Sequence, residues 1–190
     1  MIDAIREAVA ESVELKKTSF ASNAERIAAV ARQMCTALEG GCKVLPCGNG
    51  GSAADAQHIA AEFVGRFEKE RGPLRALALT TDTSILTGIG NDYGCDRIFE
   101  RQIQALGKPG DIAIAISTSG NSPNVLLAVQ AANEAGLVTV GLTGKEGGKL
   151  GGIVGHHLHI AHHSTARVQE VYILMGQILC RLVDDHMKGV

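Results

Sequence analysis

Apolar side chains recur at three- and four-residue intervals among acids and bases over residues 1–40. This spacing is typical of amphipathic helices, and it predicts one helix over residues 2–17 and a second over residues 21–38. Gly40 and Gly41 mark the end of the second helix. We expect the two to form an N-terminal helical extension that packs on a sheet or in an oligomer.

Beyond residue 42, short apolar runs alternate with helical patterns. Strands are predicted at 43–47, 74–79, 111–117, 138–142 and 158–160. Helices are predicted at 53–67, 95–106, 123–135 and 165–188. This alternation predicts an α/β fold, a doubly wound, five-stranded parallel sheet that is flanked by helices and connected by right-handed crossovers. Ligands of such sheets bind beyond the carboxyl ends of the strands.

Polar loops with glycines or hydroxyls follow three of these strands, at residues 48–52, 117–122 and 143–148. The second loop offers hydroxyl groups and the amides of a helix N-terminus without any fixed charge. Such a loop suits a phosphate, although serine and asparagine also serve simply as turn and capping residues. Two such loops after neighbouring strands favour a ligand site over capping alone.

His58 and Glu62 stand four residues apart in the predicted helix 53–67, so they share one helix face. A possible phosphate loop that leads into a histidine–glutamate pair indicates acid–base or metal chemistry. Glu62 as an ordinary acid on a helix face is the alternative.

Length and composition place the chain among globular proteins with one domain, residues 1–190. Hydrophobic residues make up 45% and aromatic residues 3%, so the core consists mainly of Ala, Val, Ile and Leu. A net charge of −2 without a basic run argues against nucleic-acid binding. The sequence contains no long apolar stretch and no hydrophobic signal-peptide core, so we expect no association with a membrane. Its five cysteines are scattered, which indicates free thiols and a cytoplasmic protein.

Competing motifs are weak. No Gly-Lys-Ser/Thr follows a glycine loop, and no GxGxxG opens a helix, which excludes the common nucleotide-binding loops. The histidine-rich residues 156–163 have the composition of a metal site. However, Leu158 and Ile160 alternate with His157 and His159, which favours a solvated strand edge over a metal site.

Six motifs together resemble the flavodoxin-like sugar isomerase (SIS) fold and, within it, the phosphoheptose isomerases. The motifs are CGNGGSAADAQHIAAEF from Cys47, TTDTSILT from Thr80, GNDYG from Gly90, ISTSGNSPNV from Ile116, LTGKEGG from Leu142 and RVQE from Arg167. The resemblance implies a homotetramer with active sites between subunits and a zinc ion in each. It also implies interconversion of sedoheptulose 7-phosphate and D-glycero-D-manno-heptose 7-phosphate, the first step towards heptoses of lipopolysaccharide or other surface glycans.

The same resemblance implies roles for individual residues. Glu62 is the expected catalytic base. Expected substrate contacts are Asn49, Gly50, Gly51, Ser52, Glu62, Asn91, Asp92, Ser117, Thr118, Ser119, Ser122 and Gln169. Expected metal ligands are His58, Glu62, Gln169 and Gln177.

The chain departs from the family at Gln177, where the family carries a histidine that is both metal ligand and proposed general acid. An amide cannot titrate, and zinc prefers imidazole nitrogen to amide oxygen, so we expect a weakened zinc site. A non-catalytic SIS tetramer, similar to the protein that associates with a replication initiator, is the alternative function. That relative also lacks the glutamate and the NGGS loop that this chain keeps. An isomerase of another sugar phosphate is a further alternative.

Overall fold

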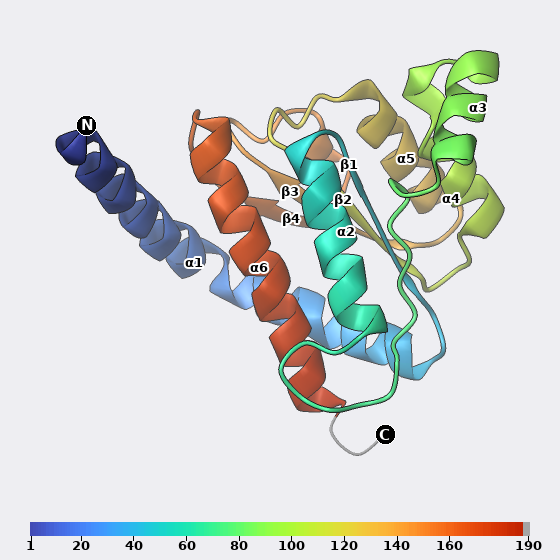
Figure 1. Cartoon of the computed structure of the whole chain (residues 1–190). Coiled ribbons are helices and arrows are strands. Elements are labelled where there is room, and N and C mark those ends of the chain that lie inside the picture. Colours follow the sequence, from blue (N-terminus) through green and yellow to red (C-terminus); the bar gives the residue numbers. More distant parts are fainter. Residues whose placement is uncertain (188–190) are drawn as a thin grey trace.

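A four-stranded parallel sheet organises the computed structural model, in which residues 1–187 are described (Figure 1). Its strands are β1 (Val44–Gly48), β2 (Ile112–Ser117), β3 (Val138–Thr143) and β4 (His156–His159), in the order β1-β2-β3-β4. The first three strands are buried almost throughout, as expected for parallel strands with helices on both faces. The predicted α/β fold with a parallel sheet and flanking helices is confirmed.

Helices cover both faces of this sheet. The α-helices are α1 (Ile2–Glu39), α2 (Gly51–Val64), α3 (Thr83–Tyr93), α4 (Glu100–Leu106), α5 (Pro123–Glu134) and α6 (Thr165–His186). Two short 3₁₀ helices, η1 (Cys95–Arg97) and η2 (Leu150–Gly152), complete the elements. Alternate residues of β2 point to opposite layers, because successive side chains of a strand face opposite sides.

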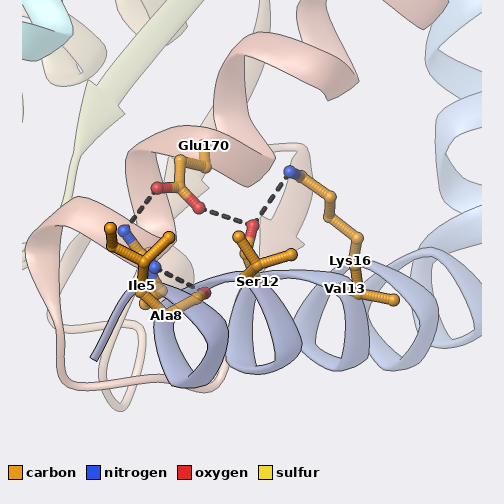
Figure 2. Close-up of a pocket in the computed structure, with 8 residues that line it drawn as sticks. Ile5, Ala8, Ser12, Val13, Lys16 and Glu170 are labelled. Carbon is orange, nitrogen blue, oxygen red and sulfur yellow. Dashed lines mark hydrogen bonds and ion pairs between the residues drawn. The ribbon is translucent and has the colours of Figure 1, made fainter. Parts of the chain in front are cut away.

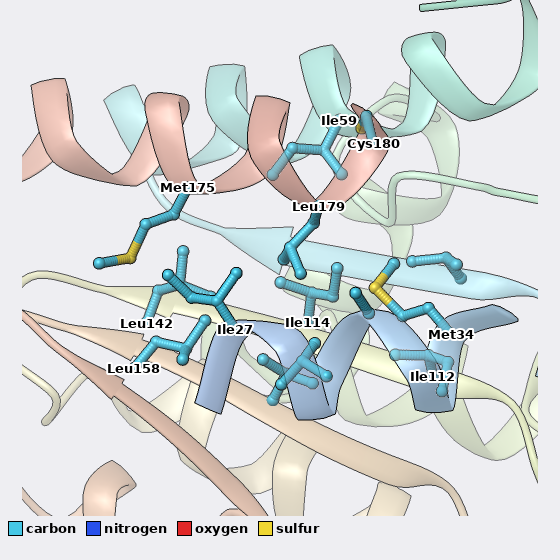
Figure 3. Packing of buried hydrophobic residues seen from close by; sticks show 14 of the residues in the cluster. Ile27, Met34, Ile59, Ile112, Ile114, Leu142, Leu158, Met175, Leu179 and Cys180 are labelled. Atoms are coloured by element: carbon cyan, nitrogen blue, oxygen red, sulfur yellow. The ribbon is translucent and has the colours of Figure 1, made fainter. Parts of the chain in front are cut away.

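The larger core lies between the sheet and the helices α1, α2 and α6. Ile114 of β2 meets Ile27 of α1 and Leu179 of α6 there, as Figure 3 shows. The second core places Ala113 and Ala115 of β2 against α4 and α5. Small residues on that side let the second layer approach the sheet closely. Both cores rest on aliphatic side chains, as the composition predicts.

The prediction of a fifth strand over residues 74–79 is wrong. This segment runs beside β1 and exchanges three backbone hydrogen bonds with it, from Val44 N to Arg75 O, Leu77 N to Val44 O and Leu79 N to Pro46 O. Only one isolated bridge, Val44 with Ala76, results. The segment pairs with β1 alone, and Leu77 in it is exposed.

Three predictions of helices also need correction. Residues 2–17 and 21–38 form the single helix α1, since no glycine or proline interrupts the chain between them. The predicted helix 95–106 divides into η1 and α4. Helix α3 was not predicted, and the predicted end of the last helix at residue 188 lies outside the described residues. No helix within residues 1–187 is long and apolar enough to cross a membrane.

Candidate active site

The turn from β1 into α2 is built for close backbone packing. Gly50 has a φ of 56°, which favours glycine, and a side chain on Gly48 would lie 2.8 Å from the Cβ of Ser52. Ser52 is buried, and its amide donates to Asn49 O at 3.0 Å. The turn therefore presents the N-terminus of α2 at the carboxyl edge of the sheet.

Three serine hydroxyls converge in the loop after β2. Ser117 Oγ lies 3.0 Å from Ser122 Oγ and 3.4 Å from Ser119 Oγ, and Ser119 Oγ accepts from the amide of Asn121 at 3.1 Å. Ser122 precedes α5 without a capping bond from its side chain, so its hydroxyl serves this cluster instead. Hydroxyls beside a helix N-terminus form an arrangement that binds phosphate.

Contacts between loops bring the three polar loops together. Asn49 and Asn124 exchange two amide hydrogen bonds of 2.9 Å, which join the β1–α2 turn to the start of α5. Gly144 N donates to Thr118 O at 3.1 Å, which joins the loop after β3 to the serine loop. The expected grouping of these loops at one edge is what the structure shows. Sequence reasoning missed Asn124, whose side chain fixes the distance between two of them.

His58 and Glu62 lie together on α2. His58 Nε2 is 3.1 Å from Glu62 Oε1, and their side chains are 46% and 24% exposed. The pair is therefore open to a ligand, and an imidazole with a carboxylate can exchange protons or bind a metal.

Asp55 stands three residues before His58 and seven before Glu62, so all three occupy one face of α2. Its Oδ2 is buried and has no hydrogen-bond partner within residues 1–187. Burial raises the pKa of Asp55, and the attraction of His58 opposes this only in part. Sequence reasoning missed Asp55, although its spacing from His58 was visible.

Tyr172 of α6 lies beneath this face. It is fully buried, its hydroxyl donates to Ser117 O at 3.5 Å, and burial together with the negative charge of Asp55 raises its pKa. Tyr172 thereby connects α2 with the end of β2, where the serine loop begins.

Helices α2 and α6 run parallel and side by side (Figure 1). A side chain on Gly51 would meet Gln169 Nε2 at 2.3 Å, and one on Gly176 would meet Ile59 at 2.7 Å. The amide of Gln169 therefore lies beside the glycine turn. His58 follows Gly51 by seven residues, or about 10 Å along the helix axis.

The four expected metal ligands lie on the neighbouring helices α2 and α6. His58 and Glu62 are in contact, whereas Gln169 lies at the glycine turn and Gln177 is a half-buried residue of α6. No group of three or more His, Cys, Asp or Glu side chains in the described part of the chain could hold a metal ion.

Asn91 and Asp92 lie on α3, away from the loops (Figure 1). Both are exposed, and Asn91 Nδ2 donates to Asp92 Oδ1 at 2.8 Å. Within residues 1–187, neither side chain forms a hydrogen bond with the serine loop.

The histidine-rich tract packs against the loop after β3. His157 Nε2 lies 2.6 Å from Thr143 Oγ1, and His159 Nε2 lies 2.8 Å from Lys145 O. Both histidines are half-buried, so the expectation of a solvated edge is too simple. Burial, together with the nearby His159 and Arg26, lowers the pKa of His157.

Comparison with known proteins agrees with this geometry. The SIS domain family model matches residues 9–144. Phosphoheptose isomerase from Nitratidesulfovibrio vulgaris (strain Miyazaki F) is 53% identical over 96% of this chain and 88% of its own length. That from Aquifex aeolicus is 51% identical over 97% of both chains. The structure of phosphoheptose isomerase from Neisseria gonorrhoeae superposes with a TM-score of 0.91 at 44% identity, covering 96% of this chain and 98% of that one.

Proposed function

Since the chain belongs to the SIS domain family, we propose that it is a phosphoheptose isomerase, which interconverts sedoheptulose 7-phosphate and D-glycero-D-manno-heptose 7-phosphate. The observation that carries the proposal is the convergence of three serine hydroxyls at the edge of the sheet where α2 begins, together with the histidine–glutamate pair further along the same helix. The similarity to phosphoheptose isomerases and the presence of Glu62 favour this enzyme over a non-catalytic SIS tetramer.

The serine loop is our proposed phosphate site. Ser117, Ser119 and Ser122 offer hydroxyls, Thr118 lies between them, and the N-terminus of α5 adds backbone amides. Hydrogen bonds and helix ends can hold a phosphate without a fixed positive charge.

The β1–α2 turn is the proposed floor under the sugar. Asn49, Gly50, Gly51 and Ser52 bring backbone amides there, and Gln169 lies against the same turn. A sugar held between this turn and the serine loop would extend along α2 towards Glu62.

Glu62 is the proposed base. Its carboxylate removes a proton from C1 of the ketose, and the electron pair of that C–H bond forms the C1–C2 double bond of an enediol. The carbonyl oxygen at C2 gains a proton in the same stage. Return of a proton to C2, with loss of the proton from the C1 hydroxyl, gives the aldose. A base within hydrogen-bond reach of both carbons can serve both transfers.

We propose that zinc binds weakly here. His58 and Glu62 have donor atoms that suit zinc, whereas Gln169 and Gln177 offer only neutral amide oxygens. A bound zinc ion would polarise the substrate carbonyl. The proton transfers described above use Glu62 and do not depend on the metal.

We propose a homotetramer with active sites between subunits. Half of α1 projects from the body of the structure (Figure 1), and its Ile5, Val9 and Val13 are exposed. Helix α3 contains no buried residue, although it carries Ile85 and Tyr93. Apolar surfaces of this kind are typical of subunit contacts. A neighbouring α3 could then supply its Asn91 and Asp92 to the substrate, as the family resemblance implies.

Hydrogen bonds between α1 and the start of α6, in the groove where the two helices meet, support the same proposal. Figure 2 shows Ser12 Oγ donating to Glu170 at 2.6 Å and Lys16 Nζ donating to Ser12 Oγ at 2.9 Å. Arg167 donates to Ala8 O at 2.8 Å. These bonds fix the angle of the projecting α1, so its apolar stripe is presented rigidly. Val9→Glu should lower the mass measured by light scattering, whereas Glu7→Gln on the same exposed helix should not.

Two broader assignments follow from the proposed activity. The product would enter synthesis of heptose precursors for lipopolysaccharide or other surface glycans. A cytoplasmic location is supported by five free cysteines, of which Cys47 is buried with its pKa raised to about 12.

The direct test is incubation of the purified protein with sedoheptulose 7-phosphate, with the aldose product followed by chromatography. Glu62→Gln keeps the shape of the side chain but removes the base, so its turnover should fall by roughly 10²–10⁴-fold. Absence of turnover by the wild type, with and without added zinc, would refute the proposal. Parallel reactions with ketose phosphates of five and six carbons test whether another sugar is the substrate.

A further inference from the structure

A buried arginine from the following loop holds the last turn of α2. Arg71 Nη2 donates to Glu62 O at 2.8 Å, and Arg71 Nη1 donates to Phe63 O at 2.9 Å. A weaker contact of 3.4 Å reaches Gly65 O. The last carbonyl groups of a helix lack partners within the helix, and a cation there is favourable. Arg71 supplies both the hydrogen-bond donors and the positive charge, and one of the carbonyl groups that it contacts belongs to Glu62, the proposed base.

Asp184 of α6 holds this arginine in turn. Its Oδ1 accepts from Arg71 Nε at 2.6 Å, and its Oδ2 accepts from the amides of Glu68 at 3.1 Å and Lys69 at 3.3 Å. The side chains of Arg71 and Asp184 are 4% and 1% exposed. Burial alone would raise the pKa of Asp184, but the hydrogen bonds from Arg71, Lys69 and Glu68 outweigh it and hold the pKa low.

A buried ion pair is a poor device for stability alone, because the loss of hydration offsets most of the attraction between the charges. This network instead connects three segments at one point: the end of α2, the loop at 65–75 and the last turns of α6. The carbonyl that it grips belongs to Glu62. The height and rotation of Glu62 over the site therefore depend on Arg71.

We propose that Arg71 is a positioning residue for Glu62, and that Asp184 fixes Arg71 in the required orientation. The inference rests on the proposed isomerase function, in which Glu62 must reach a carbon-bound proton. A displacement of about 1 Å at a reacting group can lower the rate of an enzyme on the order of 10²-fold. A small shift in the last turn of α2 would thus affect kcat while leaving the phosphate site, and with it much of KM, in place.

Asp111 provides a matched control for Asp184. It is also a buried carboxylate with one cation and two amides as partners: Lys43 Nζ at 2.5 Å, Lys43 N at 2.8 Å and Lys108 N at 2.8 Å. However, Asp111 precedes β2 and so lies at the amino end of this strand, whereas the serine loop follows its carboxyl end. Asp184→Asn and Asp111→Asn should therefore destabilise the fold in similar ways while only the first disturbs Glu62.

The test measures kcat and KM of both variants at a temperature where circular dichroism shows them folded. We expect Asp184→Asn to lower kcat about 10–100-fold relative to Asp111→Asn, with KM within about twofold. Arg71→Lys, which keeps the charge but loses the forked donors, should show the same loss of kcat. Equal kcat values for Asp184→Asn and Asp111→Asn would overturn the inference.

Hydrogen exchange separates this inference from the proposed function. The amide of Gly65 donates to Ala61 O at 2.9 Å and reports the last turn of α2. Its exchange should accelerate in Asp184→Asn and stay at the wild-type rate in Asp111→Asn. Unchanged exchange in Asp184→Asn would overturn the positioning role, whatever the activity. A wild type without turnover would overturn the proposed function and the catalytic consequence with it.

Discussion

Asp55→Asn should stabilise the protein at neutral pH. The buried Oδ2 of Asp55 has no partner in the described part of the chain, and an unsatisfied buried polar group costs about 1–3 kcal/mol. The amide of asparagine has the same shape and carries no charge, so the substitution removes the cost of burying an ionised carboxylate. A gain of about 2 kcal/mol corresponds to a rise in Tm of roughly 4–8 °C for a chain of this length.

The gain should depend on pH with a definite sign. Burial raises the pKa of Asp55 in the folded state above its ordinary value of 3.8, so the folded state binds the proton more tightly than the unfolded chain does. The contribution of Asp55 to stability is therefore greatest below the unfolded pKa, and it falls as pH rises through the folded-state pKa. Asparagine does not titrate, so the advantage of the variant should grow from pH 4 towards pH 8.

Thermal unfolding followed by circular dichroism at several pH values checks this, with the protein concentration held constant because subunit assembly would shift Tm. Asp82→Asn is the control, since Asp82 is an exposed carboxylate that caps α3 through Ile85 N, and asparagine caps equally well. A difference between wild type and Asp55→Asn that stays flat with pH, or a less stable variant at pH 7, would refute the reasoning.

Three further substitutions have expected outcomes. Gln177→His should raise zinc occupancy in elemental analysis after dialysis against zinc, because imidazole replaces an amide; unchanged content would contradict the placing of the site. Gly51→Ala should displace the amide of Gln169, now 2.3 Å from the added Cβ, and raise KM with little change in Tm, because a flexible side chain can move. Gly120→Ala should destabilise by about 1–3 kcal/mol in urea unfolding, since φ is 63° and the added Cβ would meet Gly147 O at 2.1 Å.

The strands of the sheet could be predicted where apolar residues follow one another without interruption. Residues 112–116 are a continuous apolar run between polar loops, and this is what burial on both faces requires. The segment 74–79 is also mainly apolar, although Arg75 interrupts it, and it makes only an isolated bridge with β1. An apolar pattern alone does not show whether a segment pairs along its whole length.

Helix α3, in contrast, forms although the sequence did not predict it. Its sequence, TSILTGIGNDY, is rich in glycine and β-branched residues, which are weak helix formers. The sequence does contain one signal for this helix, the N-cap residue Asp82, whose side chain accepts from Ile85 N at 2.9 Å. None of its residues is buried in the chain, so the packing that stabilises most helices comes from elsewhere. This exposure is the reason for proposing that α3 takes part in a subunit contact.

In the candidate site, residue spacing predicts which side chains share a helix face but not what surrounds them. The spacing of Asp55, His58 and Glu62 fixes their common face on α2, and this could be predicted from helical geometry alone. Their environments come from segments distant in sequence: the charge of Asp55 acts on the buried Tyr172 of α6, and Arg71 donates to the carbonyl of Glu62. The two ends of this face are thus set by different partners, so Asp55→Asn should affect stability with pH while Asp184→Asn affects turnover. Identical effects of the two substitutions would mean that α2 responds as one rigid body, and that its two ends are not controlled separately.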